Sequence, residues 1–307
     1  MTWVEQLRAQ EAAFRRAPSA HNTQPWTLDY RTDEVVIGVD PARSLPFSDP
    51  GGRDLALGLG AFVESCLIVA ADLGLAVTCD LTDTRRIRLI PATTRYATEF
   101  TTSDVESRRV ARGRYEPGPV DVAGLEPGIV QVPSRDLARD LTVADRWMFG
   151  TPAVTLELRE WLRLTPSHPR YAEDGLTDRA LELGRAEATF LRAALGAYPV
   201  ARRVGLARLL AATGAGLLRY DGTVLVLTGS DRPAGADADP DAGRRLMRTW
   251  LELARHGLAV HPLSQLIDCP ETAERLAARV GATPLAVFRT GKPLQEPTRS
   301  ARLQAAY

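Results

Sequence analysis

The sequence predicts an α+β protein in which helices surround a modest sheet. Apolar residues recur at helical spacing through several long segments, which favours amphipathic helices packed on a core. Short β-branched runs, of which residues 223–227 are the clearest, have the composition of buried strands. The chain of 307 residues is long enough for one large domain or two medium ones.

The first hundred or so residues are predicted to combine helices with short strands. Apolar and charged side chains alternate at helical spacing over residues 2–17, so we expect an amphipathic helix that ends before Pro18. The turn at residues 49–52 precedes a second apolar stripe, which predicts a long helix over residues 53–73. Strands are expected at residues 27–30, 34–39, 75–81 and 87–90.

The second half is predicted to be mostly helical. Residues 115–128 carry prolines and glycines and form a connection, and residues 234–241 have the composition of a mobile loop. Helices are expected at residues 136–149, 152–164, 177–195, 200–212, 242–256 and 271–280, and strands at residues 223–227, 258–261 and 285–289.

Composition excludes several classes of partner and site. The chain has 38 basic and 38 acidic residues, so no electrostatic signal predicts nucleic acid or a membrane as partner. Three scattered cysteines argue against a disulfide framework and against a metal site. No signal peptide and no apolar run long enough for a bilayer is apparent, so we expect a cytoplasmic protein. Nucleotide-loop, zinc-protease and hydrolase motifs are absent.

Residues 18–26, with the sequence Pro-Ser-Ala-His-Asn-Thr-Gln-Pro-Trp, form a loop between the first predicted helix and the first strand. The two prolines restrict its backbone, and five hydrogen-bonding side chains lie between them. A rigid loop of this kind suits recognition of a planar heteroaromatic edge. Composition alone, however, favours an ordinary connection with capping side chains.

Three later segments also carry candidate binding residues. Residues 108–115 contain four arginines and end in Tyr115, which fits an anion site or a solvated basic turn. Residues 257–265 pass from a glycine through a strand into a loop. Residues 288–302 combine an apolar strand, a glycine turn and a basic tail.

The order of residues in these four segments resembles the flavin-dependent nitroreductase superfamily. Its signature loop has the form Pro-Ser-small-x-Asn-(Ser/Thr)-Gln-Pro-Trp and packs on the FMN isoalloxazine from the neighbouring subunit of a dimer. Its arginine segment, Arg-Arg-(Ser/Thr)-x-Arg, grips the FMN phosphate and ribityl chain. Val110 stands where many members have Ser or Thr, so the resemblance does not carry over one hydroxyl contact.

The resemblance implies an FMN site and no catalytic side chain, because the flavin supplies the reactivity. A backbone N–H, for which Ser264 is the candidate, would face flavin N5, and either Arg299 or Arg302 would reach the phosphate. His21 has no role that the resemblance assigns. The implied cofactor-binding residues are Pro18, Ser19, Ala20, Asn22, Arg108, Arg109, Arg112, Pro262, Leu263, Ser264, Gln265, Arg299 and Arg302.

The order of the segments is similar to that of the fused, Acg-like branch of the superfamily. In a simple member the phosphate arginines precede the Pro-Ser loop, whereas here the loop comes first. This implies a nitroreductase-like fold with mixed sheets, in which two half-units form an intrachain pseudo-dimer. Residues 1–103 would be a degenerate, partner-like half and residues 104–307 the FMN-binding half, in a monomer or a homodimer.

The resemblance implies an FMN-dependent oxidoreductase that passes hydride through flavin N5 in a ping-pong reaction with a small-molecule substrate. NAD(P)H is one candidate donor. Two alternatives stay open. Residues 166–198 could lie over the flavin as a lid, which would give a flavin-binding or sequestering protein with little reductase activity. Since one fold hosts many reactions, the chain could instead be a flavin oxidase or dehydrogenase of a biosynthetic intermediate.

Overall fold

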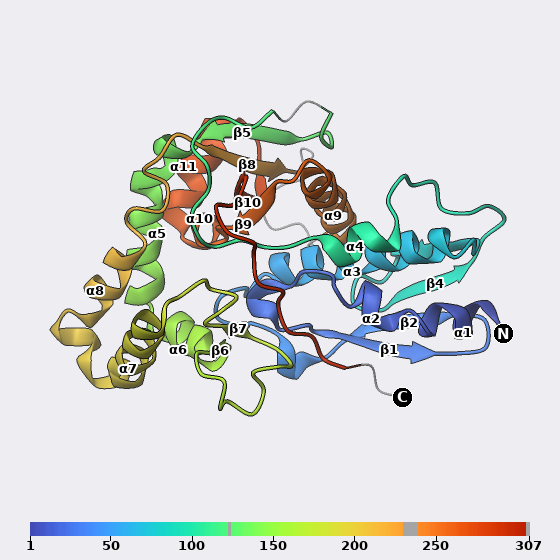
Figure 1. Ribbon diagram of the computed structural model, residues 1–307, viewed down its shortest axis with the longest axis horizontal. Coiled ribbons are helices and arrows are strands. Elements are labelled where there is room, and N and C mark those ends of the chain that lie inside the picture. The colour runs from blue at the N-terminus through green and yellow to red at the C-terminus, as the bar shows by residue number, and fades with distance from the viewer. Residues whose placement is uncertain (122–123, 230–238, 305–307) are drawn as a thin grey trace.

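The computed structural model describes residues 1–121, 124–229 and 239–304 and contains helices around two four-stranded sheets, as Figure 1 shows. The predicted α+β class is confirmed, although both four-stranded sheets are antiparallel throughout and not mixed. Of the mobile loop expected at 234–241, residues 234–238 lie outside the described residues. Pro240 and Asp241 instead begin a helix, which Asp239 caps through its side chain.

The first sheet has the strand order β1-β2-β4-β3, and a long apolar helix connects its second and third strands. Its strands and the long helix lie within two residues of the predicted bounds. The elements of this half are α1 (Trp3–Arg8), α2 (Glu11–Phe14), η1 (Ala20–Asn22), β1 (Trp26–Tyr30), β2 (Val35–Val39), η2 (Pro41–Arg43), α3 (Arg53–Asp72), β3 (Val77–Asp80) and β4 (Ile87–Pro91).

The single helix expected over residues 2–17 is wrong, because the chain forms two short helices with a break at Gln10. Glu11, the first residue after the break, is buried and needs partners for its carboxylate. Arg15 bonds to it at 2.5 Å and the Tyr30 hydroxyl at 2.7 Å. The contacts of Glu11 with Arg15 and Tyr30 therefore fix the position of the second helix, and helical periodicity does not reveal them.

The second sheet repeats the topology of the first. Its order is β5-β8-β10-β9, so in both sheets the strands lie first, second, fourth and third, with a long helix between the second and third. The elements are α4 (Thr102–Ser107), β5 (Ile129–Pro133), η3 (Ser134–Leu137), α5 (Ala138–Gly150), α6 (Pro152–Glu160), β6 (Leu162–Arg163), β7 (Leu176–Thr177), α7 (Arg185–Ala201), η4 (Arg202–Val204), α8 (Leu206–Thr213), β8 (Thr223–Thr228), α9 (Pro240–Arg255), β9 (Ala259–Pro262), α10 (Gln265–Asp268), α11 (Pro270–Val280) and β10 (Pro284–Gly291).

The helices expected at 152–164 and 177–195 are wrong at the ends that face each other. Residues there form the short parallel pair β6–β7 instead. Arg163, at the end of β6, is buried and donates to Asp174 at 2.9 and 3.1 Å. This buried ion pair joins residues eleven apart in the sequence, and it fixes an irregular segment where local pattern predicted helix. The helix expected at 200–212 starts at Leu206, after Gly205 at a φ of 100°.

Helices α3 and α9 pack directly against each other and join the two halves. A Cβ atom built on Gly60 of α3 would lie 2.8 Å from the Cα of Gly243 of α9, so the absence of side chains permits this close crossing. Next to it, buried Glu64 of α3 accepts from Arg244 of α9 at 2.9 Å and from the Tyr96 hydroxyl at 2.6 Å. Apolar contact and a charged cluster thus both hold the crossing.

Helix α3 also corrects one expectation about membranes. By length and composition it is apolar enough to cross a bilayer, the one such helix among the described residues. Within the fold, 83% of its most apolar window is buried against other parts of the protein. Its hydropathy is therefore accounted for by its place in the core.

Replacing Gly243 with Ala should destabilise the protein by about 1–3 kcal/mol or more, because the new methyl group would clash with Leu57 across the helix crossing. Urea unfolding measures the change. Gly196→Ala in α7 is the matched control, since a Cβ there meets nothing within 4 Å and is expected to stabilise slightly. Equal stabilities for both variants would contradict the close crossing.

Candidate functional site

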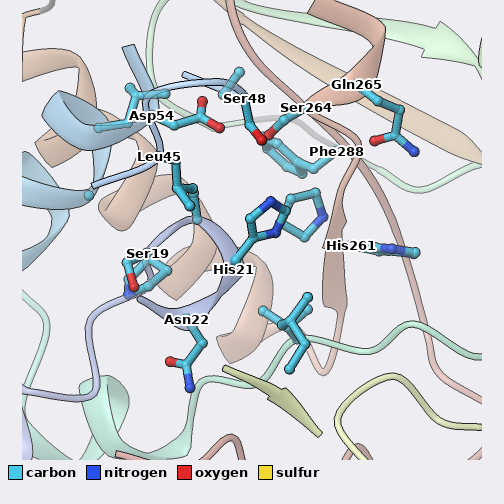
Figure 2. Close-up of a pocket in the computed structure, with 18 of the residues that line it drawn as sticks. Ser19, His21, Asn22, Leu45, Ser48, Asp54, His261, Ser264, Gln265 and Phe288 are labelled. Carbon is cyan, nitrogen blue, oxygen red and sulfur yellow. The ribbon is translucent and has the colours of Figure 1, made fainter. Parts of the chain in front are cut away.

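A cavity of about 280 Å³ is lined by residues of both halves of the chain. Its volume lies near the lower end of the roughly 300–1,000 Å³ typical of ligand pockets. Figure 2 shows side chains from the Pro18–Trp26 loop and from the segments around Asp54 and Ser264 converging on it. Apolar walls come from α3 and α9, including Leu57 and Trp250.

The Pro18–Trp26 loop is held in an unusual backbone conformation. His21, Asn22 and Gln24 all have positive φ angles, between 47° and 55°, which side-chain-bearing residues rarely adopt. The Ser19 hydroxyl accepts from the backbone N–H of Gln24 at 2.9 Å and closes the turn. Such strain persists only where surrounding contacts determine the conformation.

Two amides of the loop supply those contacts. Asn22 donates to the carbonyl oxygens of Gly175 and Ala301, at 3.1 and 3.0 Å. Gln24 donates to the carbonyl of Glu173 at 2.9 Å and accepts from the backbone of Leu303. Pro18, Ser19, Ala20 and Asn22 all line the cavity. The Asn22 amide, however, is used to clamp the loop.

A cluster of arginines forms one part of the cavity wall. Arg16, Arg108 and Arg302 line it, and none has a carboxylate within ion-pair distance among the described residues. Arg302 donates to main-chain oxygens of residues 15–17 and to Asn22. Arg108 donates to the carbonyl of Arg16 at 2.9 Å, while its Nε and Nη1 and the Nε of Arg16 are buried without a partner.

Burial and mutual repulsion depress the pKa values of these guanidinium groups. Burial first, then Arg16 and Arg109, lowers the pKa of Arg108 to about 9. Burial, then Arg299 and Arg109, lowers the pKa of Arg16 to about 10. The pKa of Arg302 falls well below its ordinary value for the same kind of reason. Buried cations with unpaired donors form a site for an anion with several oxygen atoms.

Of the other predicted arginines, Arg109 and Arg112 line the cavity and Arg299 does not. Arg109 lines the cavity but directs Nη1 to the carbonyls of Glu106 and Ser107. Arg112 lines it too, and donates to the carbonyl of Ala180 at 3.0 Å. Arg299 is exposed and does not line the cavity. Of the two candidates in the tail, Arg302 is therefore the one that reaches it.

The loop after β9 supplies a further wall. Pro262, Ser264 and Gln265 line the cavity, whereas Leu263 is fully buried in the core behind it, contrary to its expected place in the site. The backbone N–H of Leu263 still donates to the carbonyl of Val287 in strand β10, so the chain remains extended there. Successive side chains of an extended chain point in opposite directions, which turns Leu263 away from the cavity. Among the described residues, the backbone N–H of Ser264 has no acceptor, so it is available to a ligand.

His261 also lines the cavity and was missed by the sequence reasoning. Its Nδ1 accepts from Nε of buried Arg289 at 3.0 Å, and burial together with Arg289 and Arg112 keeps its pKa well below the ordinary value. The imidazole is therefore neutral with its proton on Nε2. His261 lies within the predicted segment 257–265, which could have indicated it. Its partner Arg289 lies on another strand, β10, so the contact between them could not be predicted from the local sequence.

Two carboxyl groups also line the cavity. Asp54 and Asp268 line the cavity and share one cation, Arg53, at 2.7 and 2.8 Å. Burial, with repulsion from Asp54, raises the pKa of Asp268 to about 7. The cavity is thus lined by the arginines, by this separate pair of carboxyl groups and by apolar side chains.

Comparisons with known proteins give a partial match. No family model matches the chain. Over 59 residues it is 39% identical to two proteins of Mycobacterium tuberculosis, "Putative NAD(P)H nitroreductase MT3217" of strain CDC 1551 / Oshkosh and "Putative NAD(P)H nitroreductase Rv3131" of strain ATCC 25618 / H37Rv. The match covers 19% of this chain and 17% of each relative. It supports a relationship with nitroreductase-type oxidoreductases at the level of the family.

Asp145 provides a test of the electrostatics beside Gln265. Burial raises the pKa of this carboxyl to about 6, an effect that the hydrogen bond from Gln265 only partly offsets. The folded state therefore binds the proton more tightly than the unfolded chain, and the stability this contributes at acid pH is lost as the pH rises through 6. Asp145→Asn should stabilise the protein by about 1–3 kcal/mol at pH 8 and by nearly nothing at pH 4, in urea unfolding at both values. A gain independent of pH would contradict this.

Proposed function

We propose that the chain is an FMN-dependent oxidoreductase of the nitroreductase type. The single observation that carries the proposal is the group of buried, unpaired arginine donors on Arg16 and Arg108 beside Arg302, in the wall of the cavity. A phosphate dianion offers several acceptor oxygens to such a group. The partial similarity to proteins named as nitroreductases agrees with it.

The residues present fit the parts of FMN. Arg16, Arg108 and Arg302 would hold the phosphate, and apolar side chains such as Trp250 would enclose the ring system. The free N–H of Ser264 would orient the ring edge. FMN would supply hydride acceptance and donation, so no side-chain nucleophile is needed.

We further propose that the two halves are fused units of one pseudo-dimer, divided near residue 103. The equal strand order of the two sheets supports this, as does the cavity shared by residues 16–58 and residues 108–302. In a dimer of simple subunits each site takes a loop from the partner. Here the Pro18–Trp26 loop and the arginines belong to the same chain, so a monomer would suffice.

The purified protein should be yellow and release FMN on denaturation. Arg108→Met should weaken FMN binding about 10- to 100-fold, because charge-assisted hydrogen bonds are lost. It should change the stability of the FMN-free protein little, since it removes two buried donors without a partner, and the carbonyl of Arg16 that loses its bond to Arg108 still accepts from Arg302. Flavin fluorescence titration and thermal unfolding measure the two effects.

Arg299→Met is the matched control, because Arg299 is exposed and bonds outside the cavity to Glu106. Its FMN affinity should stay within a few-fold of the parent value, given the screening of exposed charges. Colourless protein that ignores added FMN would contradict the proposed cofactor. Equal FMN affinities for the Arg108 and Arg299 variants would contradict the proposed phosphate site.

A second candidate function, a flavin-sequestering protein, is favoured by one observation. The segment at 173–176 binds the Pro18–Trp26 loop through Asn22 and Gln24, and its Leu176 lines the cavity. A segment tied down in this way narrows access to a bound ring.

Mixing the yellow protein with NADH or NADPH without oxygen separates the two functions. For an oxidoreductase that uses NAD(P)H, the visible flavin absorbance should bleach within seconds to minutes. For a sequestering protein it should persist, while dithionite still bleaches it. Asn22→Ala, which releases one tie to residues 173–175, should speed any slow bleaching; an unchanged rate would argue against restricted access.

A further inference from the structure

His21 of the Pro18–Trp26 loop lines the cavity. The proposed FMN site assigns no role to its imidazole. Figure 2 shows it near the centre of the labelled side chains, with Asp54, Ser48 and Ser264 on one side and Asn22 on the other. Its φ of 47° directs the backbone into the left-handed region. Among the described residues, the imidazole has no hydrogen-bond partner.

Contacts on both sides of His21 fix this direction. Ser19 closes the turn before it, and Asn22 is clamped directly after it by Gly175, Ala301 and Arg302. The Asn22 amide thus has both its nitrogen and its oxygen bonded within the protein, and the oxygen of Ser19 accepts from the loop backbone. Ser19, His21 and Asn22 are the hydrogen-bonding residues of this loop that line the cavity. Ser19 and Asn22 bond within the protein, whereas both ring nitrogens of His21 are available to a ligand.

Two carboxylates and one arginine act electrostatically on the imidazole of His21. Burial, the largest effect, keeps the pKa of His21 below its ordinary value, while Asp54 and Glu157 act to raise this pKa and Arg112 acts to lower it. Glu157 is fixed by the backbone N–H groups of Phe47 and Ser48, at 3.0 and 2.7 Å. A neutral imidazole offers one N–H donor and one acceptor, beside carboxylates that repel an anion.

We propose that His21 binds the second ligand of the proposed oxidoreductase, an uncharged planar compound with a carbonyl-type oxygen. This inference rests on the proposed function, in which FMN occupies the part of the cavity beside Arg16, Arg108 and Arg302. The oxygen accepts from the imidazole N–H, and the ring packs against apolar side chains such as Leu45 and Phe288. An anionic group at the same place would face Asp54 and Glu157.

Benzamide and benzoate are matched probes of this site, because they have the same shape and differ in charge. With FMN-loaded protein, calorimetry should give tighter binding of benzamide than of benzoate. His21→Gly should weaken benzamide binding by about tenfold, the effect of losing one hydrogen bond. The glycine accepts a positive φ, so the variant should retain FMN and its melting temperature should not fall.

Three variants complete the test. His21→Asn also tolerates the left-handed backbone but is too short to replace the imidazole, so it should behave like His21→Gly. Asp54→Asn should reduce the preference for benzamide over benzoate. His256→Asn, at an exposed position after α9, should change neither affinity.

Two results would overturn the inference: parent-like benzamide affinity in both His21 variants, or an unchanged preference in Asp54→Asn. FMN content is measured on the same samples. Colourless parent protein would refute the proposed function, whereas yellow His21 variants that bind benzamide normally would refute only the role of His21. The two failures are therefore distinguishable.

Discussion

The close crossing of α3 and α9 is the constraint on which the cavity depends. Gly60 and Gly243 let the two helices approach at backbone distance. Leu57 and Gly58 of α3 and Leu246 and Trp250 of α9 then form walls of the same cavity. A side chain at either glycine would move these walls apart. The helix contact therefore determines the dimensions of the cavity, and it also holds the two halves together.

The second constraint is the clamp on the Pro18–Trp26 loop. Its positive φ angles are unfavourable by themselves, and they persist because Asn22 and Gln24 bond to residues 173–175 and 301–303. Three segments distant in the sequence meet there. The polar residues of the loop therefore serve mainly to hold its shape, and His21 is left free to face the cavity.

The sequence predicts those elements that local pattern determines. Helix α3 and strand β8 are predominantly apolar segments, and their bounds agree with prediction within one residue. The break at Gln10 and the pair β6–β7 depend on the buried carboxyls Glu11 and Asp174, which bond to Tyr30 and Arg43, residues distant from them in the sequence. Strand β5 lies next to a stretch with proline and glycine and exists through pairing with β8, which no local signal reveals.

The same reason explains the site. Most residues predicted from the resemblance line the cavity, because a motif carries the local backbone with it. Arg299 and Leu263 do not, since a one-residue change of direction in a tail or strand end reverses a side chain. Arg16 lies outside the segments that carry the resemblance, and His261 lies within residues 257–265 at a position to which the resemblance assigns no role. Their importance arises from Arg108 and Arg289, which reach them from other elements.

The polarity of the cavity follows from these contacts. Burying the unpaired donors of Arg16 and Arg108 costs free energy that the fold by itself does not recover, because no carboxylate among the described residues forms an ion pair with them. A dianion at this place would offset that cost without rearranging the fold. At the acidic part, by contrast, Asp54 and Asp268 already share Arg53, so a second anion gains nothing there. This difference in charge is the physical basis of both proposals: an anionic group beside the arginines and an uncharged compound beside His21.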